Sequence, residues 1–477
     1  MTATTDRVTA VSAPGKVLLA GGYLVLDRAY NGLVFGLSAR INVVAQEIHT
    51  SEGVHLTEIV VESPQFLEAQ WRYGYHLADG DGGIKVTQLQ AGSRIVSNPF
   101  VETTLNYALT YIACTAKHRP SNSVKSARLT ILADNDYYSS PTGPSTTSSS
   151  SAAVSSSESL SSTTTTTTTT TTAATPSRFS YFPTTLLGAH KTGLGSSAAL
   201  VTALTAALLT HYLDPSVFSL STPAGKTTLH NLAQAAHCAA QGKVGSGFDV
   251  AAAVYGSCVY RRFSPGILAT LPEAGAPGFA TLLEKVIHGT GSSTLKWDTE
   301  VVKDAVSLPA GVAMRMCDVD CGSQTVGMVK QVLAWRARDP QDAKTLWDEL
   351  QRRNEALAAV LRESRLGDIR GAVRAVREYV RIIGDKSGVP IEPESQTELL
   401  DALETVEGVY GGVVPGAGGY DAVALLARDD KETLARIQAF VDGWSKEKGG
   451  RVSLMGVKGE MEGVRQQGLD LYNGWLR

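Results

Sequence analysis

Residues 191–199 (KTGLGSSAA) place glycines and serines directly before an apolar stretch. Glycine lets a backbone approach a ligand closely and adopt positive φ values. We expect a helix over residues 197–212, whose start would direct free N–H groups and the positive end of its dipole into the loop. The hydroxyls of Ser196 and Ser197 can bind a phosphate or its magnesium ion. The segment therefore predicts a phosphate-binding loop.

This loop differs from two common nucleotide-binding motifs. Residues 191–199 contain no Gly-Lys-Ser/Thr, which closes a Walker A loop. The second half of the chain shows no alternating strand and helix series of the kind that builds a dinucleotide-binding domain. A glycine-serine helix start often binds no ligand, so this loop alone leaves a purely structural role open.

Two further glycine clusters lie near the ends of the chain. Residues 12–23 (SAPGKVLLAGGY) place Lys16 in an expected tight turn, and residues 414–421 (VPGAGGYD) lie near the C-terminus. Each cluster by itself is compatible with an ordinary turn. A lysine in a buried turn needs a partner. The three clusters in this order form a more specific signal than any one of them alone.

Asp249 is the candidate acid of the site. It lies in residues 245–251 (GSGFDVA), where small residues lead into an apolar helix. The structural alternative is that its carboxylate caps the N-terminus of this helix.

The three glycine clusters resemble the motifs of the GHMP kinases, a family that includes galactokinase, homoserine kinase, mevalonate kinase and phosphomevalonate kinase. Within the family, the chain is most similar to the fungal type of phosphomevalonate kinase. A mevalonate kinase would carry a glutamate-bearing first motif of the HGEH type, where this chain has AGGY. The similar stretches are residues 12–27, 36–40 (GLSAR), 98–100 (NPF), 191–198, 236–255, 260–263 (YRRF) and 415–421.

The resemblance implies an α+β, two-domain GHMP kinase fold. Residues 1–290 would form an ATP-binding domain like domain 2 of ribosomal protein S5, and residues 291–477 a ferredoxin-like domain. The active site would lie in the cleft between them. A boundary between residues 265 and 300, rich in Gly and Pro, agrees with this division.

The resemblance also implies an activity. The chain would use ATP and Mg²⁺ to convert (R)-5-phosphomevalonate into (R)-5-diphosphomevalonate and ADP, in the mevalonate pathway of isoprenoid and sterol biosynthesis. Two alternatives stay open: another GHMP kinase of the mevalonate or homoserine type, and a non-catalytic ligand sensor of the same fold. A sensor would be favoured by loss of Lys16, Asp249 or the serine loop, and all three are present.

Site residues are assigned from the motifs and the resemblance together. Lys16, Asp249 and Ser197 are the catalytic candidates, with Ser197 also the metal ligand. The expected ATP-binding residues are Lys191, Thr192, Gly193, Leu194, Gly195, Ser196, Ser197, Ala198 and, by resemblance only, Asn98. The expected substrate-binding residues are Lys16, Tyr23, Lys243, Ser246, Arg261, Arg262, Ser323, Gly418 and Gly419.

The chemistry of the acceptor limits the role of Asp249. A phosphate monoester has a second pKa near ~6, so at neutral pH it has almost no proton to lose. We therefore expect Asp249 mainly to orient Lys16, with base catalysis secondary.

The composition limits the classes of partner and the cellular location expected for the chain. With 43 Lys and Arg against 46 Asp and Glu in 477 residues, no basic excess indicates nucleic-acid binding. Five cysteines without paired spacing indicate free thiols rather than a disulfide framework. We see no signal peptide and no membrane-spanning stretch, and expect a cytoplasmic protein that is a monomer or weak homodimer.

The expected elements place the motifs. Early strands are expected over residues 10–13, 33–47, 55–61 and 92–96 and a later one from residue 312. The Ser/Thr-rich residues 139–177 are expected to be a disordered insert joining strands at residues 128–133 and 184–189. Helices are expected over residues 229–241, with His237 as a structural residue, over 340–383 and over 431–446. Residues 413–426 read as a glycine turn and a strand.

Overall fold

The computed structural model describes residues 7–51, 56–89, 96–116, 124–139, 177–320 and 327–476. These residues form the mixed α+β architecture that the sequence predicts. The strands are β1 (Val8–Ala20), β2 (Gly32–Glu47), β3 (Glu58–Glu62), β4 (Gln70–Ala78), β5 (Gly83–Leu89), β6 (Ala127–Ala133), β7 (Tyr138–Ser139), β8 (His190–Lys191), β9 (Cys258–Arg261), β10 (Glu300–Val302), β11 (Val312–Asp320), β12 (Val409–Val413), β13 (Ala422–Arg428), β14 (Arg451–Glu460) and β15 (Arg465–Gln466). The helices are α1 (Pro99–Thr115), α2 (Ser196–Tyr212), α3 (Pro223–Gln241), α4 (Phe248–Tyr255), α5 (Gly266–Ala269), α6 (Phe279–His288), α7 (Met328–Arg338), α8 (Pro340–Arg362), α9 (Ile369–Ser387), α10 (Glu394–Leu403) and α11 (Lys431–Lys448).

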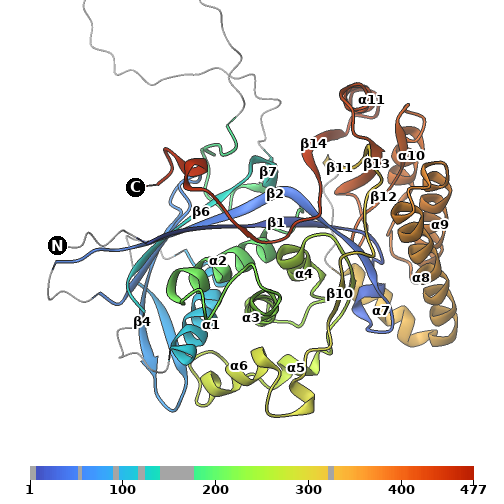
Figure 1. Ribbon diagram of the computed structural model, residues 1–477. Helices are drawn as coiled ribbons and strands as arrows, with labels where there is room; N and C mark the ends of the chain where they lie inside the picture. Colours follow the sequence, from blue (N-terminus) through green and yellow to red (C-terminus); the bar gives the residue numbers. More distant parts are fainter. Residues whose placement is uncertain are drawn as a thin grey trace, which may run out of the picture.

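One large sheet runs through both halves of the molecule (Figure 1). Its strands follow the order β12-β13-β11-β14-β2-β6-β3-β4-β5, and β1 lies antiparallel beside β2. The halves join where Gly459 and Glu460 of β14 pair with Leu37 and Gly36 of β2. Strands from the beginning and the end of the chain therefore share one continuous sheet.

Helices α1 to α4 pack together beside the long strands β1 and β2 (Figure 1). α2 is buried along most of its length, including residues 198, 199 and 201–209. A helix that is apolar all round is stable only in a core, and here β1, β2 and the helices α1, α3 and α4 enclose it. The core therefore fixes where α2 begins, which is the edge of the glycine-serine loop.

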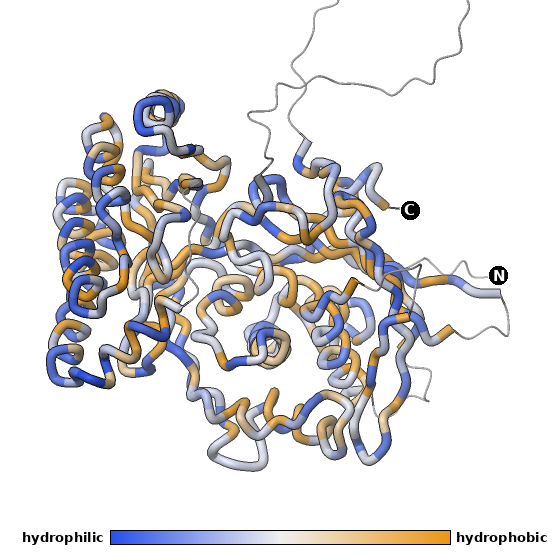
Figure 2. The backbone as a smooth tube through the Cα atoms, turned by 180° about the vertical axis from the view of Figure 1, so that it is seen from behind, coloured by the Kyte–Doolittle hydropathy of each residue, from blue (hydrophilic) through white to orange (hydrophobic). Residues whose placement is uncertain are grey.

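The C-terminal half packs α10 and α11 against its strands. Leu400 of α10 and Ile437 of α11 share a buried cluster with Val423 and Leu425 of β13. α8 and α9 lie side by side at the far end of the molecule (Figure 1). Figure 2 shows hydrophilic and hydrophobic positions alternating along both helices, as expected when one side is buried and the other faces solvent.

Two expected elements differ in the structure. Lys16 lies inside the continuous strand β1, not in a tight turn, because a bulge between Pro14 and Lys16 takes up the irregularity in register with β2. The helical region expected over residues 340–383 is broken into α8 and α9. The break follows Arg362, where Ser364 has a φ of 55°, outside the helical range.

The insert lies between paired strands, but these are not the expected ones. β7 and β8 pair antiparallel on either side of it. Residues 184–189 form bends and turns rather than a strand, with one isolated bridge from Leu67 to Thr185. Residues 140–176 and 92–95 lie outside the described residues, so the disordered loop and the strand expected there stay predictions.

The end of the chain returns to the first half. β15 pairs with β1, and the buried Tyr472 donates a hydrogen bond from its hydroxyl to Asn42 Oδ1 at 3.0 Å. The division at residue 290 stays a prediction, with residues 465–472 contacting the N-terminal half. Across the described ranges, no helix is long and apolar enough to cross a membrane.

Candidate active site

The bulge in β1 brings the first glycine cluster against the glycine-serine loop. Lys16 N–H donates to the Leu194 carbonyl at 2.9 Å. A Cβ added at Gly15 would lie 2.8 Å from the same oxygen, so only glycine permits this approach. Two segments far apart in sequence are therefore locked together by backbone contacts.

The loop itself ends in an open helix start. Gly193 and Gly195 have φ values of 73° and 80°, and Gly195 is the N-cap of α2. No side chain caps this end, so Ser197 lies in the first turn and is not the N-cap. Thr192 anchors the start of the loop by donating from its hydroxyl to the Asp136 carbonyl at 2.6 Å. The backbone N–H groups of the first turn are thus available to an anion.

The side chain of Lys16 lies along the loop. A Cβ added at Gly195 would be 2.8 Å from Lys16 Cε, and the ammonium lies 5.4 Å from the centre of the Phe248 ring. Burial lowers the pKa of Lys16, and the nearby Asp249 carboxylate opposes this by raising it. A desolvated ammonium of this kind is stabilised by any anion that enters the loop.

Asp249 lies in the first turn of α4, whose N-cap is Gly247 with a φ of 85°. The alternative of an N-cap aspartate is therefore wrong, because the cap position falls two residues earlier. Asp249 Oδ1 accepts the Val250 N–H at 3.0 Å, and Oδ2 lies 3.9 Å from His237 Nδ1. Its carboxylate thus lies near both Lys16 and a buried histidine.

His237 lies at the centre of this group, although the sequence favoured a structural role for it. Its side chain is 2% exposed. Its Nε2 atom is 3.1 Å from Ser197 Oγ and 3.2 Å from Gln241 Nε2. His237 and Gln241 are one helical turn apart on α3, so they share a face. Their spacing near the end of α3, shortly before the segment that carries Asp249, is the signal that could have identified them.

A pocket beside the loop has mainly apolar walls. It encloses about 610 Å³, including its open mouth, and Trp71, Phe100, Leu200 and Tyr138 contribute to its lining. Its polar lining residues are Ser63, Asn98, Lys191, Ser196 and Ser197. Asn98 caps α1 by accepting the Val101 N–H at 3.4 Å. The expected ATP-binding residues Asn98, Lys191, Ser196 and Ser197 therefore line one cavity.

The expected acceptor-binding arginines already have partners in the protein. Arg262 donates to the carbonyls of Leu26 at 2.7 Å and Gly245 at 2.8 Å. Arg261 pairs with Glu300 at 3.1 Å. Their role in binding an acceptor stays a prediction that requires these contacts to open.

The other expected acceptor contacts are dispersed. Lys243 is exposed, and Ser246 is half-buried in the same loop. The carbonyl of Ser246 accepts a hydrogen bond from the Tyr260 hydroxyl at 2.8 Å. Ser323 lies outside the described residues.

The third glycine cluster is held against the first. Gly416 N–H donates to the Leu18 carbonyl at 3.0 Å, and the hydroxyl of Tyr23, expected to bind the substrate, donates to the Ala417 carbonyl at 2.6 Å. A Cβ added at Gly22 would lie 2.2 Å from the Gly416 carbonyl oxygen. The glycines here make room for the chain itself.

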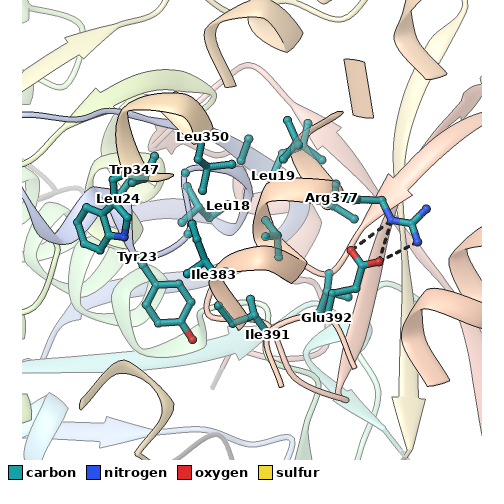
Figure 3. Close-up of a pocket in the computed structure, with 18 residues that line it drawn as sticks. Leu18, Leu19, Tyr23, Leu24, Trp347, Leu350, Arg377, Ile383, Ile391 and Glu392 are labelled. Carbon is teal, nitrogen blue, oxygen red and sulfur yellow. Dashed lines mark hydrogen bonds and ion pairs between the residues drawn. The ribbon is translucent and has the colours of Figure 1, made fainter. Parts of the chain in front are cut away.

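Ile391 closes the other side of this cluster. Its carbonyl accepts the Gly419 N–H at 2.9 Å and would lie 2.2 Å from a Cβ added at Gly418. Behind the two clusters lies an apolar cavity formed by β1, α8 and α9 (Figure 3). Its one ion pair, between Arg377 and Glu392 at 2.8 Å, is already complete, so this cavity does not offer free charge to a phosphate.

Comparisons with known proteins agree on one family. The model described as GHMP kinases N terminal domain matches residues 184–257, and the model described as GHMP kinases C terminal matches residues 356–445. The chain is 62% identical to phosphomevalonate kinase ERG8 of Gibberella zeae, covering 98% of each chain. It is 46% identical to phosphomevalonate kinase erg8 of Aspergillus fumigatus, covering 98% of this chain and 99% of the relative.

Two further matches are a plant relative and a solved bacterial structure. The chain is 33% identical to a peroxisomal phosphomevalonate kinase of Arabidopsis thaliana, covering 88% of this chain and 90% of the relative. The solved structure of Streptococcus pneumoniae phosphomevalonate kinase in complex with phosphomevalonate and AMPPNP matches with a TM-score of 0.56 and 14% identity, covering 96% and 99% of the two chains. This last likeness is one of fold.

Proposed function

The chain belongs to the GHMP kinase family, and from this membership we propose that it transfers the γ-phosphate of ATP to (R)-5-phosphomevalonate. The products are ADP and (R)-5-diphosphomevalonate. The observation that carries this proposal is 62% identity, over nearly the full length of both chains, to a phosphomevalonate kinase. The geometry supports it, because Lys16, Ser197 and Asp249 lie together around the open start of α2.

The reaction brings two negatively charged groups together. An oxygen of the acceptor phosphate forms a bond to the γ-phosphorus, while the bond from that phosphorus to the β-phosphate bridging oxygen breaks and leaves its electron pair on ADP. Catalysis then depends on positioning and on positive charge. Lys16 and the first-turn N–H groups of α2 supply that charge on one side of the glycine-serine loop.

The residues present fit a magnesium ion that arrives with ATP. Within the described ranges, no group of three or more His, Cys, Asp or Glu side chains could hold a metal by itself. Mg²⁺ commonly binds through one or two protein groups and the substrate phosphates. The Ser197 hydroxyl in the pocket lining would hold it. When bound, the ion neutralises charge on the ATP phosphates.

In this proposal Asp249 acts mainly on Lys16, and removal of an acceptor proton is secondary. The acceptor phosphate is mostly dianionic at neutral pH because its second pKa is near ~6. The Asp249 carboxylate raises the pKa of Lys16 against the effect of burial. It therefore favours the charged ammonium, which is the form that stabilises the transferring phosphate.

The mainly apolar pocket beside the loop is the place for the adenosine part of ATP. Trp71 and Phe100 offer apolar surface to a base, while Asn98 and Lys191 offer polar groups at its edge. The acceptor then approaches from the side of Lys243, Ser246, Gly418 and Gly419. Arg261 and Arg262 contribute if their present contacts open, and Ser323 completes the predicted acceptor residues.

We assign the reaction to isoprenoid and sterol biosynthesis in the cytoplasm, by a monomer or weak homodimer that binds neither nucleic acid nor membrane. The peroxisomal name of the Arabidopsis relative suggests the peroxisome as an alternative location. Imaging of the chain with a fluorescent tag at each end in turn, beside a peroxisomal marker, distinguishes the two locations.

The decisive experiment is a coupled assay of ADP release. ATP, Mg²⁺ and the chain are mixed with phosphomevalonate, mevalonate, galactose or homoserine in turn. Turnover with phosphomevalonate alone is expected. Turnover with another acceptor would keep the kinase and change its substrate, whereas nucleotide binding without ADP release from any of the four would favour a ligand sensor.

A further inference from the structure

His237 connects the two candidate groups of the site that come from different helices. It projects from the last part of α3 to the first turns of α2 and α4, reaching Ser197 Oγ at 3.1 Å through Nε2 and Asp249 Oδ2 at 3.9 Å through Nδ1. The ring is packed 5.8 Å from the Phe100 ring, centre to centre. It therefore has a fixed place between the serine loop and the acid.

The neighbouring amide favours one tautomer of the ring. Gln241 Nε2 has only N–H donors, and it lies 3.2 Å from His237 Nε2. In the neutral ring, that nitrogen is then the acceptor and Nδ1 carries the hydrogen, on the side that faces the Asp249 carboxylate. Nε2 has one lone pair, which the Ser197 hydroxyl at 3.1 Å then shares as a donor with the Gln241 amide at 3.2 Å.

This arrangement matters for a serine that binds a cation. A hydroxyl uses an oxygen lone pair to ligate a metal, so its hydrogen must point to an acceptor elsewhere. Ser197 lines the pocket beside the phosphate loop, whereas His237, whose Nε2 lies 3.1 Å from Ser197 Oγ, is not one of the residues that line it. The accepting nitrogen of His237 therefore leaves the Ser197 oxygen free to bind a cation in the pocket.

We propose that His237 is a positioning residue that accepts the hydrogen of the Ser197 hydroxyl and directs the oxygen of Ser197 to the magnesium ion of bound ATP. The Asp249 carboxylate, with Oδ2 3.9 Å from Nδ1, adds a negative charge near the ring nitrogen that carries the hydrogen in this tautomer. The proposal rests on the proposed function insofar as the ligand is Mg–ATP, but it concerns nucleotide binding and needs no acceptor. Its failure can therefore be separated from a failure of the phosphomevalonate assay.

The test compares ATP binding with and without Mg²⁺ by titration calorimetry, using His237→Ala. Partners of metal ligands typically contribute about 10–100-fold to metal affinity or activity. We expect Mg-free ATP to bind as in the unchanged chain, and the gain in affinity on adding Mg²⁺ to fall by about tenfold or more. His237→Gln, which restores a carbonyl acceptor, should recover part of that gain.

Two further variants separate this role from a structural one. His230 lies on the same helix and is equally buried, and its Nδ1 is 3.1 Å from Asn231 Oδ1, so His230→Ala should change thermal stability and not the magnesium-dependent gain. Ser197→Ala combined with His237→Ala should lose no more of the gain than Ser197→Ala alone. Equal weakening of ATP binding with and without Mg²⁺ in His237→Ala, or additive losses in the double variant, would overturn the proposal.

Discussion

Glycine has opposite roles in two regions of the molecule. These regions are the glycine-serine loop and the contact between the first and third glycine clusters. At Gly193, an added Cβ would meet nothing within 4 Å, although the φ of 73° is one that favours glycine. At Gly22 and Gly418, an added Cβ would lie 2.2 Å from a carbonyl oxygen of another segment. One glycine site is open and the other two are filled by protein.

This difference distinguishes a ligand site from a contact between two halves of the chain. We call the contact between residues 12–23 and residues 414–421 the joint. The open loop ends in an uncapped helix with Lys16 alongside it, so its free donors can serve an anion. In the joint, the N–H of Gly416 and the hydroxyl of Tyr23 already have carbonyl partners. A glycine-rich motif therefore indicates close approach, and only its surroundings show what approaches.

Replacing Lys16 should have the largest effect, because it removes the charge that belongs to the open loop. Loss of one preorganised electrostatic contact typically costs about 10²–10³ in kcat, and we expect a loss of this size for Lys16→Met in the ADP-release assay. Lys386→Met is the control, since this exposed lysine of α9 pairs with Asp342 at 3.2 Å, away from the loop. A loss below tenfold for Lys16→Met would mean that the charge beside the loop does not take part in phosphate transfer.

Gly193→Ala and Gly418→Ala test the comparison directly. A left-handed backbone costs an alanine about 1–2 kcal/mol, and both variants incur this cost. Gly418→Ala must also displace the Ile391 carbonyl, so we expect it to lose clearly more unfolding free energy in urea. Gly193→Ala should instead show its effect mainly in the KM for ATP. Equal losses of stability would mean that the two glycine sites do not differ as described.

The pH profile sharpens the assignment of Lys16. Burial lowers its pKa and Asp249 raises it, so kcat/KM should decline on the alkaline side as Lys16 loses its proton. The charged form is active, and activity is therefore present below this pKa and lost above it. Asp249→Asn removes the charge that raises the pKa and should move the alkaline decline to lower pH. If the alkaline decline stayed at the same pH, Asp249 would not influence the pKa of Lys16.

The local parts of this site could be predicted from sequence. The loop over residues 191–199 and the helix after it depend on neighbouring residues, and the structure has α2 beginning within one residue of the expected position. The strand β2 and the helix α11 also follow from local patterns. Local glycine chemistry and hydrophobic periodicity are sufficient for elements of this kind.

Contacts between distant parts of the chain decide the surroundings of other site residues. His237 looks like a core residue of α3 until the starts of α2 and α4 are placed beside it. Arg262 looks available to a substrate, but backbone carbonyls of Leu26 and Gly245 accept its hydrogen bonds. Such partners lie far away in the chain or depend on a turn, so residue type and spacing alone do not reveal them.

Tyr23→Phe should have a smaller effect than the Lys16 and Gly418 variants, and it tests the joint without disturbing its packing. The ring stays in the apolar cavity (Figure 3), while the 2.6 Å hydrogen bond to the Ala417 carbonyl is lost. A single hydrogen bond contributes about 0.5–1.5 kcal/mol to stability, and urea unfolding should show a loss in this range. Because the bond holds the third glycine cluster, we also expect a higher KM for phosphomevalonate and an unchanged KM for ATP.

Tyr30→Phe is the matched control for this last prediction. The Tyr30 hydroxyl donates to Asp348 Oδ1 at 2.8 Å, so it also joins the N-terminal half to α8, but without touching the third glycine cluster. Both variants lose one hydrogen bond between the halves, and the stability of both should fall. Only Tyr23→Phe should change the KM for phosphomevalonate. If both variants or neither changed it, the joint would hold the two halves together without setting the position of the acceptor.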